Sequence, residues 1–220
     1  MGTPAALLHY IHDPLCGWCY GASPLVTAAR AVLPVSAHGG GMMAGRNRRQ
    51  VSADLRNYVM PHDRRIAQLS GQVFGERYFN GLLTDTSAVF DSGPPIAAVL
   101  AMQALKGNEA GLDLLAAIQR AHYQEGRRIS DPPVLVALAA QLGADSAAFA
   151  SALPQQDLET HFQATHRLLD QVGGRGFPTF VLQRGPAMEV IDVAVWLGRP
   201  LQWAAHLRGA MEAASALSAR

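Results

Sequence analysis

The chain has 220 residues and a formal net charge of +1, and 49% of its residues are hydrophobic while 16% are charged. An average soluble domain carries roughly 25% charged residues, so this composition excludes a disordered chain and indicates a well-buried globular protein. A net charge near zero gives no overall field that would attract nucleic acid or an anionic membrane, and no apolar run reaches the roughly 18 residues of a membrane span. We therefore expect neither nucleic acid nor a membrane as a partner.

The first eight residues lack the basic region and the long apolar stretch of a secretory signal. We therefore expect a cytoplasmic protein. In a reducing compartment, two cysteines three positions apart indicate a catalytic or metal-binding role rather than a structural disulfide.

Both cysteines lie where a predicted strand turns into a predicted helix. Leu8–Ile11 reads as a short apolar strand, and an amphipathic helical pattern begins at Gly17. Cys16 therefore stands at a helix N-terminus, where unpaired N–H groups and the helix dipole favour thiolate over thiol. Cys19 lies one turn further on, within reach for a disulfide. This arrangement predicts a site for dithiol–disulfide exchange.

Two other interpretations of the cysteine pair are weaker. A structural disulfide over so short a loop would constrain the chain little. A zinc site would need His9 and His12 as further ligands. Because these histidines are three apart on a predicted strand, they point to opposite faces of the sheet. We therefore expect no metal.

The segment after the first helix predicts a second strand and then a long helical region. Pro34–His38 reads as a strand that Gly39–Gly41 ends, which gives a parallel βαβ unit. Strand signals are almost absent between residues 42 and 172. Helices are expected there over 51–60 (stopped by Pro61), 62–83, 96–105 (capped by Asp91-Ser92), 109–125, 132–142, 145–153 and 155–172.

Strand signals return after the glycine-rich turn at 173–176. Residues 179–182 and 187–191 form a predicted hairpin joined by Gly185-Pro186, and a helix beginning near Pro200 closes the chain. The order of elements divides the chain into residues 1–44 plus 173–220, which carry the strands, and an inserted helical domain at 45–172.

Three motifs resemble those of the DsbA-like thiol:disulfide oxidoreductases. They are Cys16-Gly17-Trp18-Cys19, Pro24 in the first helix, and Gly176-Phe177-Pro178-Thr179. The segment Asp13-Pro14 before the cysteines is similar to that of the cytoplasmic branch of the family. The resemblance implies an α/β, thioredoxin-like fold with a large all-helical insertion after the second strand.

The resemblance also implies roles for these residues. Cys16 would attack the substrate disulfide, and Cys19 would resolve the mixed disulfide. Pro178 would be cis and face the cysteines, with Phe177 and Thr179 beside it as one wall of a substrate groove that also includes Gly17 and Trp18. The expected partners are thiol- or disulfide-bearing proteins or small molecules, with a recycling reductant or oxidant. Besides the redox-active disulfide no cofactor is expected, and glutathione is a candidate co-substrate. The chain would act as a monomer or a homodimer.

One position departs from the family pattern. Many members carry a buried carboxylate six residues before the first cysteine, where this chain has Tyr10. Asp13, His12 or water are the alternatives for proton transfer, and the sequence does not choose among them.

Two other functions fit the same architecture. Kappa-type glutathione transferases and 2-hydroxychromene-2-carboxylate isomerases resemble it, but they use serine at the first position and lack the pair, so Cys19 argues against them. A non-catalytic binding protein that uses the groove without redox cycling is the second alternative.

Overall fold

A four-stranded sheet forms the centre of the molecule. The computed structural model describes residues 6–218 and the side chains up to residue 212; most of the segment on which the secretory-signal prediction rests, residues 1–5, lies outside this range. The sheet order is β2-β1-β5-β6, with β1 (Leu7–His12), β2 (Val35–Gly39), β5 (Thr179–Arg184) and β6 (Ala187–Ile191). β1 pairs parallel with β2 and antiparallel with β5, while β5 and β6 form the predicted hairpin.

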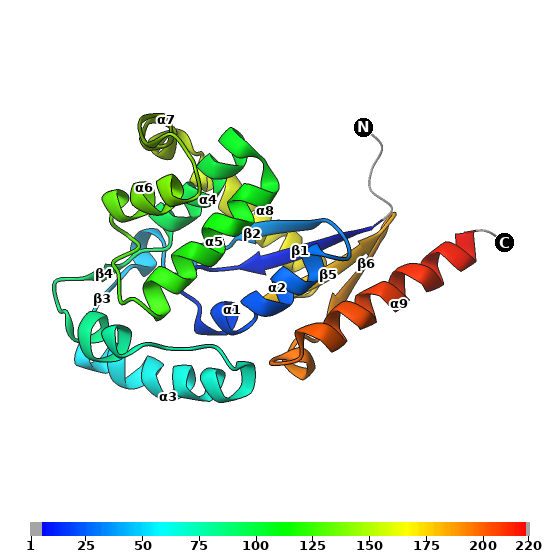
Figure 1. The fold of residues 1–220 in the computed structure, drawn as a ribbon, viewed down its shortest axis with the longest axis horizontal. Coiled ribbons are helices and arrows are strands. Elements are labelled where there is room, and N and C mark those ends of the chain that lie inside the picture. The colour runs from blue at the N-terminus through cyan, green and yellow to red at the C-terminus, as the bar shows by residue number, and fades with distance from the viewer. Residues whose placement is uncertain (1–5, 219–220) are drawn as a thin grey trace.

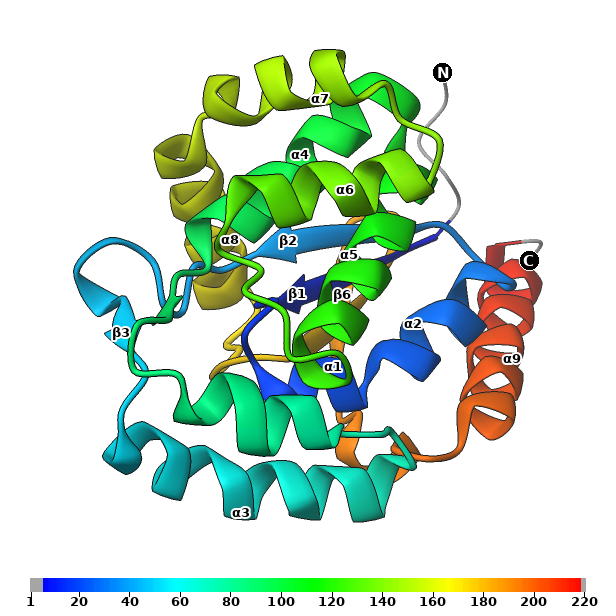
Figure 2. The ribbon, with the colours of Figure 1, turned by 60° about the vertical axis from the view of Figure 1, so that its left-hand side comes forward.

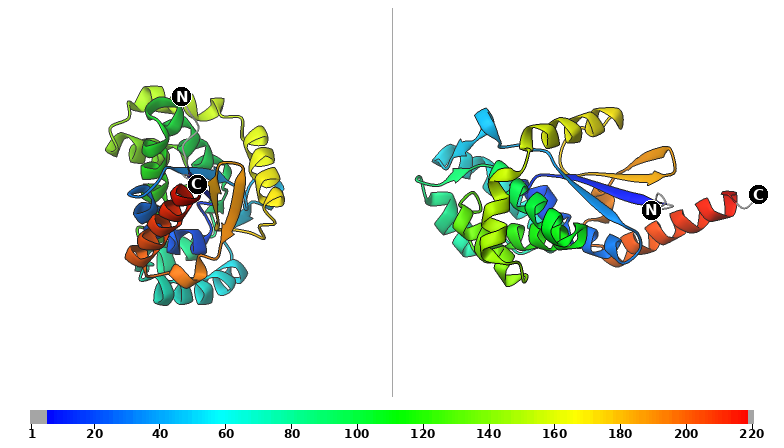
Figure 3. Two further views of the ribbon diagram at one scale, coloured as in Figure 1. Left: turned by 90° about the vertical axis from the view of Figure 1, so that its right-hand side faces the viewer. Right: turned by 90° about the horizontal axis from the view of Figure 1, so that it is seen from above.

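Helices cover both faces of this sheet (Figure 1). α1 (Gly17–Gly21), α2 (Ser23–Arg30) and α9 (Pro200–Ser218) lie on one face, and α8 (Leu158–Gln171) lies on the other (Figure 3). β1 is therefore buried from Leu8 to His12, and its sequence lacks the alternation of polar and apolar residues expected of a strand with one solvated face. Trp203 of α9 is fully buried, and its indole N–H donates to the carbonyl of Leu25 at 3.0 Å, which fixes α9 against α2.

The helices between β2 and β5 follow the predicted order. They are α3 (Ala53–Ser70), α4 (Gly93–Lys106), α5 (Asn108–Tyr123), α6 (Pro132–Gln141), α7 (Ser146–Ala152) and α8. Short 3₁₀ turns occur at η1 (Gly45–Asn47), η3 (Leu82–Thr84), η4 (Leu153–Gln155) and η5 (Ala194–Trp196), and a π turn at η2 (Arg77–Gly81). Figure 2 shows α3 on one side of α1 and α4–α7 on the other. The thioredoxin-like fold with a large insertion after the second strand is thus confirmed.

The insertion is not all-helical, contrary to prediction. β3 (Arg49–Gln50) and β4 (Val89–Phe90) form a two-residue antiparallel ladder. Strands this short leave no period-2 pattern in the sequence, because alternation needs at least four residues to be recognised.

The prediction that Pro61 stops a helix is wrong. α3 continues through Pro61 to Ser70 and ends at Gly71, whose φ of +74° favours glycine. Pro61 and Asn57, the residue four positions before it, both face solvent, so water can satisfy the carbonyl that loses its partner. The helix predicted over 62–83 does not form as one element: α3 ends at Ser70, and a π turn and a 3₁₀ turn follow over 77–84. Two of its expected core positions, Leu69 and Val73, are 47% and 61% exposed.

The first helix breaks as its proline suggested. α1 ends at Gly21, and α2 begins at Ser23 with Pro24 in its first turn, where a missing N–H costs nothing. No helix in residues 6–218 combines the length and apolar character needed to cross a bilayer.

Candidate active site

Cys16 stands at the N-cap of α1 with extended backbone angles, φ −92° and ψ 114°. Its carbonyl accepts hydrogen bonds from the N–H groups of Cys19 and Tyr20 at 2.9 and 3.1 Å, which starts the helix. Its side chain is 7% exposed, and its thiol donates to the carbonyl of Phe177 at 3.4 Å. Cys16 therefore faces the loop that carries Pro178, as the family resemblance implied.

Cys19 lies behind Cys16 and is completely buried. Both cysteines are free thiols in this structure. The backbone N–H of Asp13 donates to Cys19 Sγ at 3.5 Å. Burial, followed by the hydrogen bond and charge of Cys16, raises the pKa of Cys19 well above its usual value. The pair is thus asymmetric: the second sulfur is held as a neutral thiol away from solvent.

The loop opposite the cysteines is built around the Phe177–Pro178 peptide bond, which is cis. The ring of Phe177 packs directly on Gly40, where any Cβ would overlap the aromatic carbons. The carbonyl of Gly40 accepts a hydrogen bond from His166 of α8 at 2.8 Å. The glycine run after β2 therefore supports one wall of the site, because the Phe177 ring packs on it. The sequence indicated only that these glycines end a strand.

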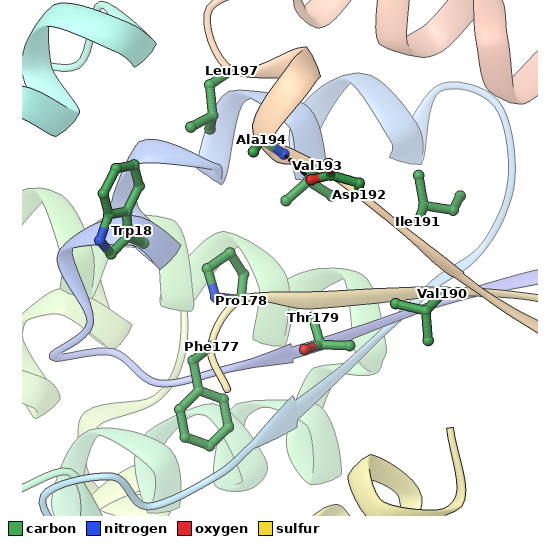
Figure 4. A pocket seen from close by; sticks show the side chains of 10 residues that line it. All are labelled: Trp18, Phe177, Pro178, Thr179, Val190, Ile191, Asp192, Val193, Ala194 and Leu197. Atoms are coloured by element: carbon green, nitrogen blue, oxygen red, sulfur yellow. Dashed lines mark hydrogen bonds between the residues drawn. The ribbon is translucent and has the colours of Figure 1, made fainter. Parts of the chain in front are cut away.

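A cavity of about 210 Å³ opens beside Pro178. Figure 4 shows Trp18 on one side of Pro178, with Val193 and Leu197 above. The hydroxyl of Thr179 donates to the carbonyl of Gly176 at 2.7 Å, so it shapes the loop rather than pointing freely into the cavity. The lining consists of Trp18, Phe177, Pro178, Thr179, Val190, Ile191, Asp192, Val193, Ala194 and Leu197.

Asp13 is a fully buried carboxyl group next to the cysteines. Its Oδ1 accepts hydrogen bonds from the N–H of Leu15 at 2.9 Å and the hydroxyl of Ser92 at 2.8 Å, and its Oδ2 accepts from the N–H of Met42 at 2.6 Å. Burial raises its pKa to about 6, against the effect of these three donors. Its charge in turn raises the pKa of Cys19.

Ser92 is a residue whose position in the site the sequence did not reveal. Asp91-Ser92 was expected to cap a helix, and Ser92 does occupy the N-cap position of α4, but its side chain makes no capping hydrogen bond. The acceptor at this helix end is Asp91, whose Oδ1 accepts from the N–H of Gly93 at 2.8 Å. Ser92 is fully buried and instead joins α4 to Asp13, while it also accepts from the N–H of Met43 at 3.1 Å. A serine before a helix carries the same local signal in both roles.

Tyr10 and His12 lie on one face of β1, with their rings stacked 4.9 Å apart. Tyr10 donates to the carbonyl of Cys19 at 3.1 Å. Burial, helped by nearby His38 and His161, lowers the pKa of His12 to about 3, so this ring remains neutral. Of the two side chains named as alternatives for proton transfer, Asp13 is the one that carries charge near neutral pH.

His9 points to the opposite face of the sheet, as its position predicted. Its ring nitrogens lie 3.0 Å from His38 Nε2 and 2.7 Å from Gln183 Oε1. Within the described residues no group of three or more His, Cys, Asp or Glu side chains could hold a metal ion. His9 therefore belongs to a hydrogen-bonded chain across the sheet.

The comparisons with known proteins agree with this geometry. The family profile described as "DSBA-like thioredoxin domain" matches residues 69–199, more than half of the chain. The cytosolic disulfide reductase DsbM of Pseudomonas aeruginosa is 54% identical, with a TM-score of 0.87 over 94% of this chain and 98% of that one. The chain belongs to the DSBA-like thioredoxin domain family. It is a thiol:disulfide oxidoreductase, and Cys16 and Cys19 fit the redox motif of this family.

Further structures place the chain more widely within the fold. DsbM in a structure with GSH is 53% identical, with a TM-score of 0.85 and coverage of 94% and 99%. A candidate protein disulfide isomerase from Nitrosomonas europaea is 25% identical, with a TM-score of 0.73 and coverage of 92% and 95%. A 2-hydroxychromene-2-carboxylate isomerase is 19% identical, with a TM-score of 0.56 over 91% and 98%, which shows the shared fold alone. No curated protein matched.

Proposed function

We propose that this oxidoreductase works in the cytoplasm as a disulfide reductase that takes its electrons from glutathione. The observation that carries the proposal is the asymmetry of the cysteine pair. Cys16 contacts the carbonyl of Phe177, a residue that lines the cavity beside Pro178, whereas Cys19 is completely buried behind it and protonated. The similarity to DsbM, described as a cytosolic disulfide reductase and present in a structure with GSH, supports the direction and the donor.

In the proposed reaction Cys16 is the nucleophile and Cys19 the resolving thiol. The Cys16 thiolate attacks one sulfur of the substrate disulfide, and the other sulfur leaves and takes a proton. Cys19 then gives up its proton and attacks Cys16 Sγ, which releases the second substrate thiol. The substrate disulfide becomes two thiols while Cys16 and Cys19 form a disulfide, and two glutathione molecules restore the dithiol as they are oxidised to glutathione disulfide.

The substrate would lie in the cavity beside Pro178. Trp18 and Phe177 flank it with apolar surface, and Thr179 lies beside them in the lining. The carbonyl of Phe177, already within 3.4 Å of Cys16 Sγ, marks where the substrate sulfur must approach. An extended substrate backbone can pair with this loop in the manner of an added strand.

A coupled assay and a redox equilibrium test the proposal together. The chain is incubated with a model disulfide, glutathione, glutathione reductase and NADPH, and NADPH loss is followed with and without the protein. In parallel, the Cys16–Cys19 pair is equilibrated in glutathione buffers, alkylated and weighed as the intact protein. The expected results are catalysed turnover and a reversible two-proton mass shift. Turnover that needs an added oxidant, or a pair that stays oxidised in reducing glutathione buffers, would overturn the reductase direction.

A further inference from the structure

A buried carboxyl group from the inserted segment touches the redox motif. Asp63 lies in α3 and is 4% exposed. Its Oδ1 packs against Gly17, the residue after Cys16, so closely that a Cβ at Gly17 would overlap it. Gly17 is the first residue of α1. The charge of Asp63 therefore lies beside the helix end that holds the Cys16 thiol.

The packing of α3 on α1 explains this close approach. Gly17 and Gly21 are four residues apart and occupy the same side of α1. A Cβ at Gly21 would lie 2.6 Å from Cγ2 of Ile66, and one at Gly17 would lie 3.1 Å from its Cδ1. Two glycines one turn apart thus let α3 approach the backbone of α1. Asp63 and Ile66 of α3 both contact α1 as a result.

Asp63 has one hydrogen-bond partner within residues 6–218. The hydroxyl of Tyr78 donates to Oδ2 at 2.8 Å, and neither a cation nor another donor reaches Oδ1. A buried carboxyl group with so few partners is costly to keep ionised. Burial accordingly raises the pKa of Asp63 to about 7, so its charge changes within the physiological range. A buried carboxyl group with a shifted pKa, next to the residue that follows Cys16, is a candidate functional group.

The other titratable groups in this region keep one charge state near pH 7. Burial raises the pKa of Tyr78 and Tyr123 well above 10, and Tyr123 senses the charges of Asp63 and both cysteines. Burial lowers the pKa of His122, which packs on Tyr78, to about 3. Asp13, on the far side of the cysteines, is the exception with its pKa of about 6.

We propose that Asp63 is a positioning residue which, through its charge against Gly17, controls how readily the Cys16 thiol ionises. When Asp63 is neutral, no charge from α3 opposes formation of the Cys16 thiolate. When Asp63 is ionised, two negative charges lie close together in a region of low dielectric constant, and the thiolate is disfavoured. The proton that Cys16 releases goes to water in both cases. Ionised Asp63 thereby lowers the reduction potential of the Cys16–Cys19 pair, because a destabilised thiolate is oxidised more readily.

The experiment compares wild type with Asp63→Asn. Asparagine keeps the shape and can still accept from Tyr78, but it carries no charge. We measure Cys16 alkylation by iodoacetamide from pH 5 to 9 with peptide mapping, and the midpoint of the pair in glutathione buffers. Asp63→Asn is expected to raise the alkylation rate near pH 7.5 by about tenfold. In wild type, the titration of Asp63 should produce a step near pH 7 in the plot of alkylation rate against pH, and this step should be absent in Asp63→Asn. The Cys16–Cys19 disulfide of the variant should also be easier to reduce.

Two further variants separate this role from a general disturbance. Asp54→Asn makes the same change at an exposed position of α3 and should leave both readouts as in wild type. Tyr78→Phe removes the hydrogen bond that favours the ionised carboxyl, so the step should move to higher pH without disappearing. The proposal is overturned if Asp63→Asn matches wild type. Should that variant not fold, a wild-type profile without a step near pH 7 overturns it equally.

Discussion

The thiol of Cys16 donates to the carbonyl of Phe177 at 3.4 Å, across 161 positions of sequence. This contact joins the start of α1 to the loop before β5, because β1 and β5 are neighbours in the sheet. The proposed nucleophile and the proposed groove wall thus come from distant parts of the chain.

The two cysteines should respond differently to the same substitution. Cys16→Ser should abolish reduction of a model disulfide, because the second of the chain's two cysteines, Cys19, is completely buried. Cys19→Ser should retain attack by Cys16 but stop at the mixed disulfide, because the resolving thiol is gone. Intact mass after incubation with glutathione disulfide checks this: the adduct of one glutathione should accumulate only in Cys19→Ser. An adduct on Cys16→Ser instead would reverse the assigned roles.

Gly17 should tolerate a methyl group only when Asp63 is made smaller. Gly17→Ala drives a Cβ into the Asp63 carboxyl group and should destabilise the protein by about 1–3 kcal/mol through overpacking. The double variant Gly17→Ala, Asp63→Ala should recover most of that loss relative to Asp63→Ala alone, as denaturant unfolding can measure.

A matched control for this cycle lies in α9. Gly209 is also helical, but nothing lies within 4 Å of its Cβ position, so Gly209→Ala should stabilise by about 0.5–1 kcal/mol. If the changes in the free energy of unfolding caused by Gly17→Ala and Asp63→Ala simply added in the double variant, the close contact between the two residues would be contradicted.

Gly40 should control the position of the groove wall. Gly40→Ala places a methyl group where the Phe177 ring lies, so the loop that carries Pro178 must shift. Because small displacements of positioning groups reduce rates strongly, kcat/KM for a model disulfide should fall about tenfold or more. Alkylation of Cys16 by iodoacetamide, which needs no groove, should change much less. Equal losses in both measurements would mean that the substitution damages the thiol rather than the groove.

Acid should destabilise the protein through its buried histidines. His122 is 1% exposed, and burial lowers its pKa in the folded protein to about 3. In the unfolded chain His122 is protonated near pH 6.5, whereas in the folded protein it stays neutral down to about pH 3. The free energy of unfolding therefore keeps its full value, as far as His122 is concerned, above pH 6.5 and decreases as the pH falls toward 3. Each pH unit within this window should cost up to about 1.4 kcal/mol for this residue.

The variant His122→Phe isolates that contribution. It keeps an aromatic ring among Phe90, Tyr78 and Tyr123 but cannot be protonated. Denaturant unfolding at pH 7.5, 6, 5 and 4 should show a flatter decline for His122→Phe than for wild type. The exposed His62→Phe should follow wild type. An unchanged slope in His122→Phe would place the acid sensitivity elsewhere.

Local sequence patterns were sufficient for the order of the main elements and for the redox motif. Short strand segments bounded by turn residues predicted β1, β2 and the β5–β6 hairpin, and helical periodicity predicted most helices. The motif at Cys16 and Cys19 needed no tertiary information, since it lies within four consecutive residues. The domain boundaries at 44–45 and 172–173 and the choice between monomer and homodimer stay predictions. So do the roles of the expected site residues, which are Cys16, Gly17, Trp18, Cys19, Phe177, Pro178 and Thr179.

Only the tertiary structure decided which distant residues complete the site. Asp13 was a candidate by proximity in sequence, but its bond to Ser92 depends on how α4 docks. In the sequence, Asp63 cannot be distinguished from other polar residues of a surface helix. It reaches the redox motif because Gly17 and Gly21 of α1 leave room for α3 to pack there. Its unusual pKa follows from burial, and burial is a property of packing between segments rather than of local sequence. The sequence therefore determined the chemistry at the two sulfurs, and the packing of the insertion determined the charges around them.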